Sequence, residues 1–380
     1  MIASPPARLS SLDGLRGVAA LVVVIYHATK IAQPLLHGTD RTVFRVISES
    51  PVKLLFAGTE AVLVFFVLSG LVVALPAFRP GFSWTGYFGS RLIRLYLPVW
   101  GALLVATALI LLVHRDPTTA TAGSWLVVGN ATTVTPATFA GEASLLQRSY
   151  DIDNVLWSLR WELIFSVTLP AFVVAARAVR RFAPLVVLLA TVASLLGRLS
   201  GVEALVYLPV FFAGAVLASR LADLQQWSSR RSRGFWFAVA AGSALMLIGG
   251  WLFRPAVDPG SALGLALWGL AAFGAVGLVI TAVGSRGAAR ALSRRPTRWL
   301  GRVSFSLYLV HVPVLATLAF AWGEASWPWV IAVGIPASLV LAEVFTRLVE
   351  APSHRLARAV RRRLDAFVAT PREAREPSVP

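Results

Sequence analysis

The sequence contains a succession of apolar runs, each about twenty residues long and each bounded by polar or basic segments. A helix needs about 20 consecutive apolar residues to cross the hydrocarbon core of a bilayer, which is about 30 Å thick. Only 14% of the 380 residues are charged, whereas soluble domains carry about 25%. The chain is therefore predicted to be an integral membrane protein, and disordered, collagen-like and most water-soluble folds are excluded.

The predicted fold class is all-α: a polytopic membrane helical bundle of about ten transmembrane helices. The ten expected spans lie at 15–36, 52–75, 92–114, 155–178, 182–199, 203–221, 234–253, 261–283, 303–322 and 328–349. Residues 115–154 are too polar, and too interrupted by Pro136, to form another span. We expect them to form one long loop with room for a re-entrant or surface element.

The basic residues predict the orientation of the bundle. With ten spans both termini lie on one side of the membrane, and 26 of the 35 Lys and Arg residues fall on that side, against 8 on the other. Because cytoplasmic loops are rich in Lys and Arg, both termini are expected in the cytoplasm. This bias explains the net charge of +17 without nucleic acid as a partner. We expect a multi-pass protein of the cell (inner or plasma) membrane, in contact with the lipid bilayer.

Three segments are expected along the chain: a cytoplasmic N-terminal segment at 1–14, a transmembrane domain at 15–352, and a basic cytoplasmic tail at 353–380 that is partly disordered. The tail has the pattern of an amphipathic helix that anchors on anionic lipid. The chain has no cysteine, so disulfides, thiolate metal ligands and a cysteine nucleophile are excluded, and no metal site is expected.

Ionisable residues inside membrane spans are costly and are candidates for function. His27 lies eleven residues beyond Arg16 in the first span, about 16 Å deeper and on nearly the same helix face. Glu60, counted from the outer end of the second span, lies about 12 Å deep, at a similar height. We interpret His27 as a general base that Glu60 orients. The alternatives are a histidine that only joins helices and a glutamate that faces water in a vestibule.

Further candidates lie at the cytoplasmic ends of the first three spans. Asp13 and Arg16 are either a helix cap and a positive-inside anchor or part of a site. Ser69 belongs to a small-residue seam that favours close packing over a nucleophile. Arg91 and Arg94 share a helix face and are either a phosphate clamp or ordinary cytoplasmic charge.

The fourth span opens with polar residues inside an apolar run. Arg160 and Glu162 need partners, which are each other, Glu60 or a polar acceptor that enters from outside. Trp157 and Trp161 share a face and fit either an interfacial aromatic belt or a platform on which a sugar stacks.

The last two spans add three candidates. Tyr308 and His311 continue a polar stripe that begins at Ser304 in the ninth span. Glu350, at the end of the tenth span, lies between Arg347 and Arg355 and is interpreted as a member of an ion pair.

Six elements in order resemble the acyltransferase-3 family of membrane proteins over about 13–352. They are DGLRG at 13–17 with its following His27, FFVLSG at 65–70, Arg-x-x-Arg at 91–94 with Pro98, WSL-x-x-E at 157–162, S-x-S-x-Y-L-x-H at 304–311, and E-x-P at 350–352.

The resemblance implies an acyltransferase that moves groups other than amino-acyl groups. The donor would be cytoplasmic acyl-CoA, with acetyl-CoA as the default, and no cofactor would be bound permanently. The acceptor would be a hydroxyl of a carbohydrate, a glycolipid or a glycosylated, macrolide-type metabolite. Residue by residue, it implies that His27 is catalytic and that Arg91 and Arg94, supported by Arg16, bind the donor. The oligomeric state stays open.

Two positions depart from the family pattern. Many members carry an aspartate where this chain has Leu63, and this chain has Glu60 one turn earlier. Arg160 stands where small or polar residues are common in the family.

Two other functions stay open. A transporter or flippase would use the buried charges as a path without acyl transfer, and a noncatalytic scaffold of a polysaccharide assembly complex would need neither Arg91 nor Arg94.

Overall fold

The computed structural model describes residues 7–39 and 41–373, and within them every regular element is a helix. The long helices are α1 (Ala7–Thr39), α3 (Gly58–Ala74), α4 (Trp84–Leu112), α7 (Leu156–Ala178), α8 (Ala183–Ser200), α9 (Glu203–Ser219), α11 (Arg233–Leu252), α13 (Ala271–Gly284), α15 (Arg295–Trp322), α16 (Trp327–Phe345) and α17 (Ala351–Glu373).

Shorter helices connect or extend them. They are α2 (Arg41–Ser48), α5 (Trp125–Val128), α6 (Pro136–Ala143), α10 (Leu221–Ser229), α12 (Ala262–Gly269) and α14 (Arg286–Leu292), with the 3₁₀ turns η1 (Pro51–Phe56), η2 (Leu75–Phe78), η3 (Pro117–Thr119), η4 (Arg180–Phe182) and η5 (Glu324–Ser326) and the π turn η6 (Thr346–Glu350).

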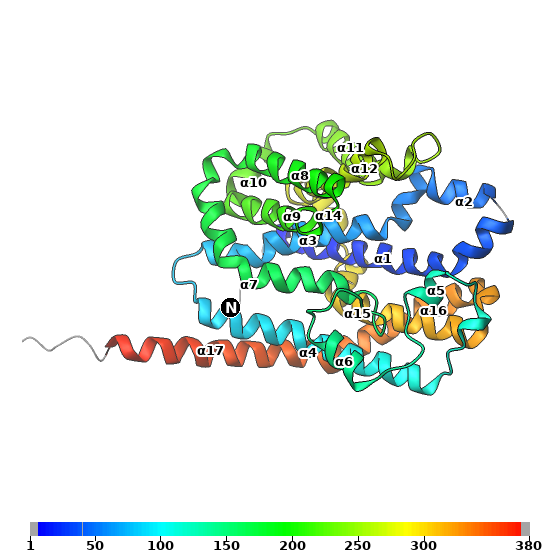
Figure 1. Cartoon of the computed structure of the whole chain (residues 1–380). Helices are drawn as coiled ribbons and strands as arrows, with labels where there is room; N and C mark the ends of the chain where they lie inside the picture. The colour runs from blue at the N-terminus through cyan, green and yellow to red at the C-terminus, as the bar shows by residue number, and fades with distance from the viewer. Residues whose placement is uncertain (1–6, 40, 374–380) are drawn as a thin grey trace, which may run out of the picture.

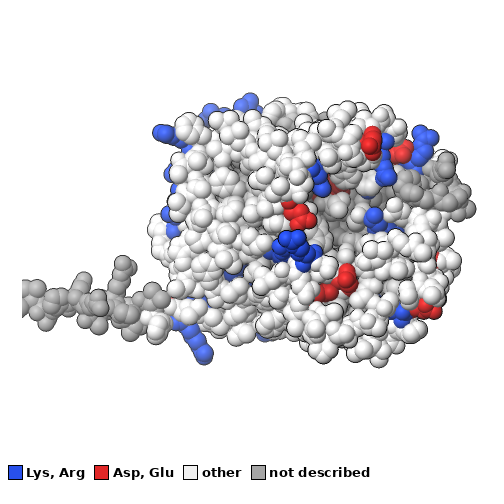
Figure 2. Space-filling view, viewed as in Figure 1, with Lys and Arg blue, Asp and Glu red and all other residues white. Residues whose placement is uncertain are grey.

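The prediction of an all-helical membrane bundle is confirmed. Among the described residues, nine helices are long and apolar enough to cross a membrane, and the pair α9 and α10, bent by 72°, makes a tenth if it counts as one span. Figure 2 shows that most of the viewed face carries no charged side chain, as a lipid-facing surface requires. In Figure 1, α17 continues beyond one end of the bundle, whereas α2 and α5 lie at the other end.

Helix α15 forms the centre of the bundle, since 83% of its most apolar window is buried. It packs against α1, and glycines allow the two backbones to touch. A Cβ on Gly17 would lie 2.4 Å from the backbone nitrogen of Gly301, and a Cβ on Gly301 would lie 2.3 Å from the carbonyl oxygen of Asp13. Small residues at such crossings are typical of membrane helices. The glycines of the DGLRG element therefore fix the position of α1 on α15.

The same device joins α3 to α9. A Cβ on Gly70 would lie 2.1 Å from the carbonyl oxygen of Phe211, and one on Gly214 would lie 2.2 Å from that of Val67. This contact confirms the predicted close packing at Gly70, whereas the neighbouring Ser69 donates a hydrogen bond to Glu162 on α7 (3.0 Å).

The long segment between α4 and α7 is a folded outer layer that contains η3, α5 and α6, as the sequence allowed. The expected basic tail is also helical, but it is no separate element. Helix α17 follows α16 through the single π turn η6, so the last span and the described part of the tail form one long helix. Along its first half α17 lies beside α4 (Figure 1).

Candidate active site

Two histidines meet in the middle of the bundle. The Nδ1 atom of His27 on α1 lies 3.0 Å from the Nε2 atom of His311 on α15. Each histidine follows the contact glycine of its own helix, Gly17 or Gly301, by ten residues, a rise of about 15 Å. Because the two helices cross at these glycines and rise side by side, the imidazoles arrive at the same height.

The hydrogen bonds of the pair fix its tautomers when both rings are neutral. The Nδ1 atom of His311 lies 2.9 Å from the carbonyl oxygen of Leu307, and a carbonyl can only accept. The Nε2 atom of His311 therefore carries a lone pair and accepts a hydrogen bond from Nδ1–H of His27. This arrangement leaves Nε2 of His27 without a proton. That atom is the one suited to take a proton from a substrate.

The predicted contact between Glu60 and His27 is wrong. Glu60 accepts hydrogen bonds from Nε1 of Trp251 (2.9 Å) and from the hydroxyl of Thr59 (3.1 Å), and none of the hydrogen bonds between described residues joins it to His27. The reason is depth. Residues 51–56 form a 3₁₀ turn outside the helix, so Glu60 lies in the first turn of α3 instead of eight residues into a span. His311 holds the orienting position that was expected for Glu60.

An outer cavity of about 690 Å³ lies on the side of His27 that faces α5. Trp125, which lines this cavity, packs against the His27 ring with centroids 5.2 Å apart and the ring planes tilted by 30°. Lys30, one turn beyond His27 on α1, lines it as well. Neither histidine is among the residues that line this cavity. His27 keeps 9% of its surface accessible whereas His311 has none, so His27 is the less enclosed of the two.

The loop that carries Trp125 is held by buried polar contacts. Arg115 donates to the carbonyl of Ala131 (2.8 Å) and to the hydroxyl of Thr317 on α15 (2.9 Å). Glu142 accepts three backbone N–H bonds, from Asp151, Ile152 and Asp153, at 2.7 to 3.1 Å. Burial raises the pKa of the Glu142 carboxyl, while these N–H groups act in the opposite direction.

Replacing Glu142 with alanine is expected to loosen this outer layer. The variant leaves three N–H groups, two of them buried, without their acceptor, at a cost of roughly 3 kcal/mol. We expect a melting temperature several degrees lower in a thermal-unfolding assay of the detergent-solubilised protein. The matched control is Glu142→Gln, which keeps one oxygen acceptor. Its melting temperature should lie between those of the alanine variant and the wild type. Equal melting temperatures for alanine and wild type would show that the N–H groups find other partners.

An inner cavity of about 330 Å³ lies at the opposite end of the bundle, lined mainly by residues of α3, α4, α7, α15 and α17, with Arg16 from α1. Its charged lining comprises four arginines, two glutamates and one histidine. These residues are Arg16, Arg91, Arg94, Arg361, Glu162, Glu350 and His354. Their position on the side with the basic loops makes this the cytoplasmic cavity under the predicted orientation.

The two arginines expected to form a phosphate clamp have different surroundings. Arg91 is already engaged, because its Nη2 atom lies 2.5 Å from Glu162 and its Nε–H donates to Ser166 (3.0 Å). Arg94 lines the same cavity, and its buried Nε has no hydrogen-bond partner among the described residues. A symmetrical clamp is therefore not formed, and Arg94 is the more available of the two.

Glu162 forms hydrogen bonds with two of the residues predicted at the cytoplasmic ends of the spans, Ser69 and Arg91. Its Oε1 atom accepts from Ser69 (3.0 Å) as well as from Arg91, so Glu162 does not pair with Arg160 or Glu60. Asp13 pairs only loosely with Arg16, at 3.8 Å on the helix surface. The predicted helix cap is wrong, because α1 begins at Ala7 and Asp13 lies six residues inside it. Arg16 lines the inner cavity.

Tyr308 connects the histidines to the inner cavity. It lines that cavity, its ring centroid lies 6.0 Å from that of His311, and its hydroxyl is 2.7 Å from the hydroxyl of Ser158. The polar stripe predicted on the ninth span thus leads from the inner cavity to the buried pair.

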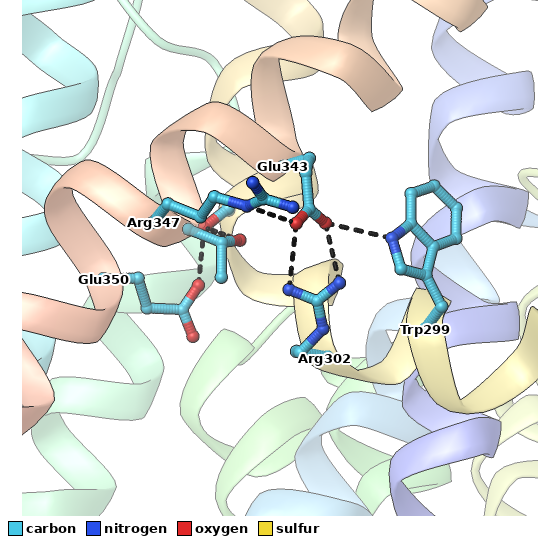
Figure 3. A network of polar contacts seen from close by, with 7 residues as sticks. Trp299, Arg302, Glu343, Arg347 and Glu350 are labelled. Atoms are coloured by element: carbon cyan, nitrogen blue, oxygen red, sulfur yellow. Dashed lines mark hydrogen bonds and ion pairs between the residues drawn. The ribbon is translucent and has the colours of Figure 1, made fainter. Parts of the chain in front are cut away.

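The ion pair predicted for Glu350 belongs to another residue. Figure 3 shows the carboxylate of Glu343 between Arg302, Arg347 and the indole of Trp299, at 2.7 to 2.9 Å. Arg347 lies one turn after Glu343 on the same face, so it turns away from Glu350.

Glu350 instead faces inward from the π turn. It accepts a 2.5 Å hydrogen bond from Ser306 on α15, and its other oxygen lies 4.0 Å from the Nε2 atom of His354. Glu350 therefore belongs to the wall of the inner cavity and not to the surface ion pairs.

Arg160 and Trp157 lie at the outer end of α7. Both line a third cavity of about 330 Å³, and Trp157 also lines the large outer cavity. The ring of Tyr207 packs against Trp157 (5.6 Å) and Trp161 (5.2 Å), so the tryptophans are part of a cavity wall.

Several lining residues were missed in the sequence. His354 and Arg361 are seven residues apart on the tail helix and therefore share a face, a spacing that was visible in the sequence. Trp125 begins the one-turn helix α5, which is too short for a periodic pattern to indicate its neighbours. Among residues 7–39 and 41–373, no three His, Asp or Glu side chains are grouped as a metal would require.

Comparison with known proteins agrees with this arrangement. The sequence profile described as "Acyltransferase domain", which defines the acyltransferase-3 family, matches residues 9–347. Neither the curated proteins nor the solved structures include a significant match. The matched segment contains α1 through α16, and with them both histidines and most of the lining of the cavities. The chain therefore belongs to the acyltransferase-3 family and is a multi-pass membrane acyltransferase.

Proposed function

We propose that this acyltransferase moves an acetyl group from cytoplasmic acetyl-CoA to a hydroxyl of a carbohydrate or glycosylated acceptor that enters from the other side. The observation that carries the proposal is the His27–His311 pair between two cavities at opposite ends of the bundle. Trp125 separates it from the outer cavity and Tyr308 from the inner one.

The inner cavity supports a nucleotide-bearing, anionic donor. Four arginines and two glutamates leave its lining with a formal charge of +2 if His354 is neutral. Arg94 and Arg361 are suited to the phosphates of CoA, since a guanidinium binds phosphate with two parallel N–H bonds. Phe65, Phe66 and Leu159 provide the apolar part that a pantetheine chain would contact.

The reaction needs one base and no covalent intermediate. Nε2 of His27 takes the proton from the acceptor hydroxyl while the oxygen forms a bond to the thioester carbonyl carbon. The carbon–sulfur bond then breaks, and the CoA thiolate leaves with the proton that His27 returns. His311 holds the Nδ1–H of the imidazolium in the meantime. The acetyl group is proposed because His311 and Tyr308 fill the passage and leave little room for a longer chain.

The outer cavity supports a sugar as the acceptor. Trp125, Tyr150 and Trp157 provide aromatic faces, and Gln33, Asp151 and Asn154 provide polar groups. Such a combination of rings for stacking and groups for hydrogen bonding suits the alternating apolar and hydroxylated faces of a sugar.

Mass spectrometry of surface glycans and secreted metabolites tests the proposal. A strain that lacks the gene should lose the mass increment of one acetyl group from one product, and the wild-type gene should restore it. The purified protein in nanodiscs should release CoA from acetyl-CoA only when that acceptor is added. Movement of the acceptor across a vesicle membrane without consumption of acetyl-CoA would favour a transporter and contradict the proposal.

Arg94→Gln is expected to raise the KM for acetyl-CoA by roughly tenfold and to change kcat little, because a donor phosphate loses a charged hydrogen bond far from the reacting carbon. Steady-state kinetics in nanodiscs measures both constants. The matched control is Arg362→Gln, which removes an exposed arginine of α17 outside the cavity lining. An unchanged KM for the Arg94 variant would place the phosphates elsewhere.

A further inference from the structure

The third cavity, at the outer ends of α7, α8 and α9, combines arginine with aromatic rings. Its arginines come from three separate elements: Arg148 from the loop before α7, Arg160 from α7 and Arg198 from the last turn of α8. Glu203, at the start of α9, is the acidic member of the lining. Three arginines and one glutamate leave a formal charge of +2.

These three arginines lack an ion-pair or hydrogen-bond partner among the described residues. None of them makes an ion pair or a hydrogen bond with another residue in the described part of the chain, and only Arg160 makes a ring contact, 5.4 Å from Trp161. The outer layer is not poor in partners in general, since Arg115 nearby makes two hydrogen bonds. Arg160 and Arg198 are nevertheless half-buried. Cations gathered in this way without partners repel one another, and an anion would relieve the repulsion.

The third cavity adjoins the outer cavity beside His27. Arg148, Tyr150 and Trp157 line both cavities, so the two share a wall along the start of α7. Figure 2 shows basic and acidic side chains side by side next to a hollow in the middle of the viewed face. A molecule that fills both cavities would reach from the arginines to Trp125, which packs against His27.

We infer that the third cavity is an anion subsite for the acceptor. The acceptor is then an acidic glycan, with a carboxylate or a phosphate ester on the sugar next to the one that receives the acyl group. The neighbouring sugar stacks against the wall that Trp157, Trp161 and Tyr207 form together, and its anionic group receives N–H bonds from Arg160 and Arg198. This inference rests on the proposed function and specifies its acceptor.

Binding measurements with defined disaccharides test the subsite without any acyl transfer. The probes are cellobiouronic acid (a carboxylate), cellobiose 1-phosphate (a phosphate ester) and neutral cellobiose, and their Kd values are measured on the full chain in nanodiscs. We expect at least one anionic probe to bind roughly tenfold more tightly than cellobiose. The preference should decrease with salt, since the cavity is open to water.

Variants of the cavity arginines test whether these residues cause the tighter binding of anionic probes. Arg160→Gln/Arg198→Gln should reduce it to less than about twofold, and Arg160→Lys, which keeps the charge but not the fork of N–H groups, should retain part of it. Arg45→Gln removes an exposed outer arginine from α2, away from the cavity, and should leave the preference unchanged. Unchanged melting temperatures exclude misfolding, and the lysine variant serves as the test if the double variant is unstable.

Two results would overturn the inference: equal Kd values for charged and neutral probes in the wild type, or a preference that the double variant retains. Preference for one anionic probe over the other would identify the group as carboxylate or phosphate ester. Failure of the proposed function has a different signature. Arginine-dependent binding of the anionic probe would persist, but acetyl-CoA would not be consumed with any acceptor.

Discussion

Replacing His27 with alanine is expected to lower acyl transfer by about 10⁴-fold, the upper end of what a positioned general base contributes. His27 is the less enclosed member of the histidine pair, and the neutral hydrogen-bond chain leaves its Nε2 as the free proton acceptor. With alanine in its place, an acceptor hydroxyl would have to attack the thioester with its proton still attached. The rate of acetyl transfer to the product identified by mass spectrometry is the measurement.

His114→Ala is the matched control. His114 is exposed at the end of α4, outside the lining of the three cavities, and its loss should leave the rate within about twofold. The His27 variant should reach the membrane in normal amounts and melt near the wild-type temperature. Product formation at a near-normal rate by His27→Ala would exclude this imidazole from the reaction.

The sequence predicted the architecture well because a bilayer restricts the options. Apolar runs of sufficient length give helices, and the described residues contain nine or ten spans, as expected. The predicted span 203–221 ends where α9 bends by 72° into α10. Boundaries were less predictable, because residues 51–56 have the composition of a span but fold into a 3₁₀ turn.

That boundary caused the main error in the site. Depth counted from residue 52 placed Glu60 near His27, whereas the helix begins at Gly58 and Glu60 meets Trp251. His311 was recognised as part of a polar stripe, but no local pattern shows that two residues 284 apart in sequence share a hydrogen bond. The glycine contact between α1 and α15 sets that register, and it becomes visible only when both helices are in place.

The sequence indicated which charged residues need partners, but it did not identify the partners. Arg160, Glu162 and Glu350 were expected to have charged partners, and the short spacings in sequence suggested local ones. Glu162 on α7 pairs with Arg91 on α4. It does not pair with Arg160, because residues two apart on a helix point to different sides. The same geometry directs Arg160 into the third cavity and Glu162 into the inner one.

Replacing His311 with leucine is expected to reduce kcat by roughly 10²-fold and to leave both KM values within about twofold, since the residue acts on His27 and not on substrate. Leucine fills the space but cannot accept the hydrogen bond from Nδ1–H of His27, so that ring loses its fixed tautomer and the acceptor that holds its proton. His311→Gln is the discriminating variant. Its amide can accept from His27 through oxygen and donate to the carbonyl of Leu307 through nitrogen, and it should recover roughly tenfold of the lost rate. Equal losses in both variants, accompanied by raised KM values and lower melting temperatures, would instead assign His311 a packing role at the crossing of α1 and α15.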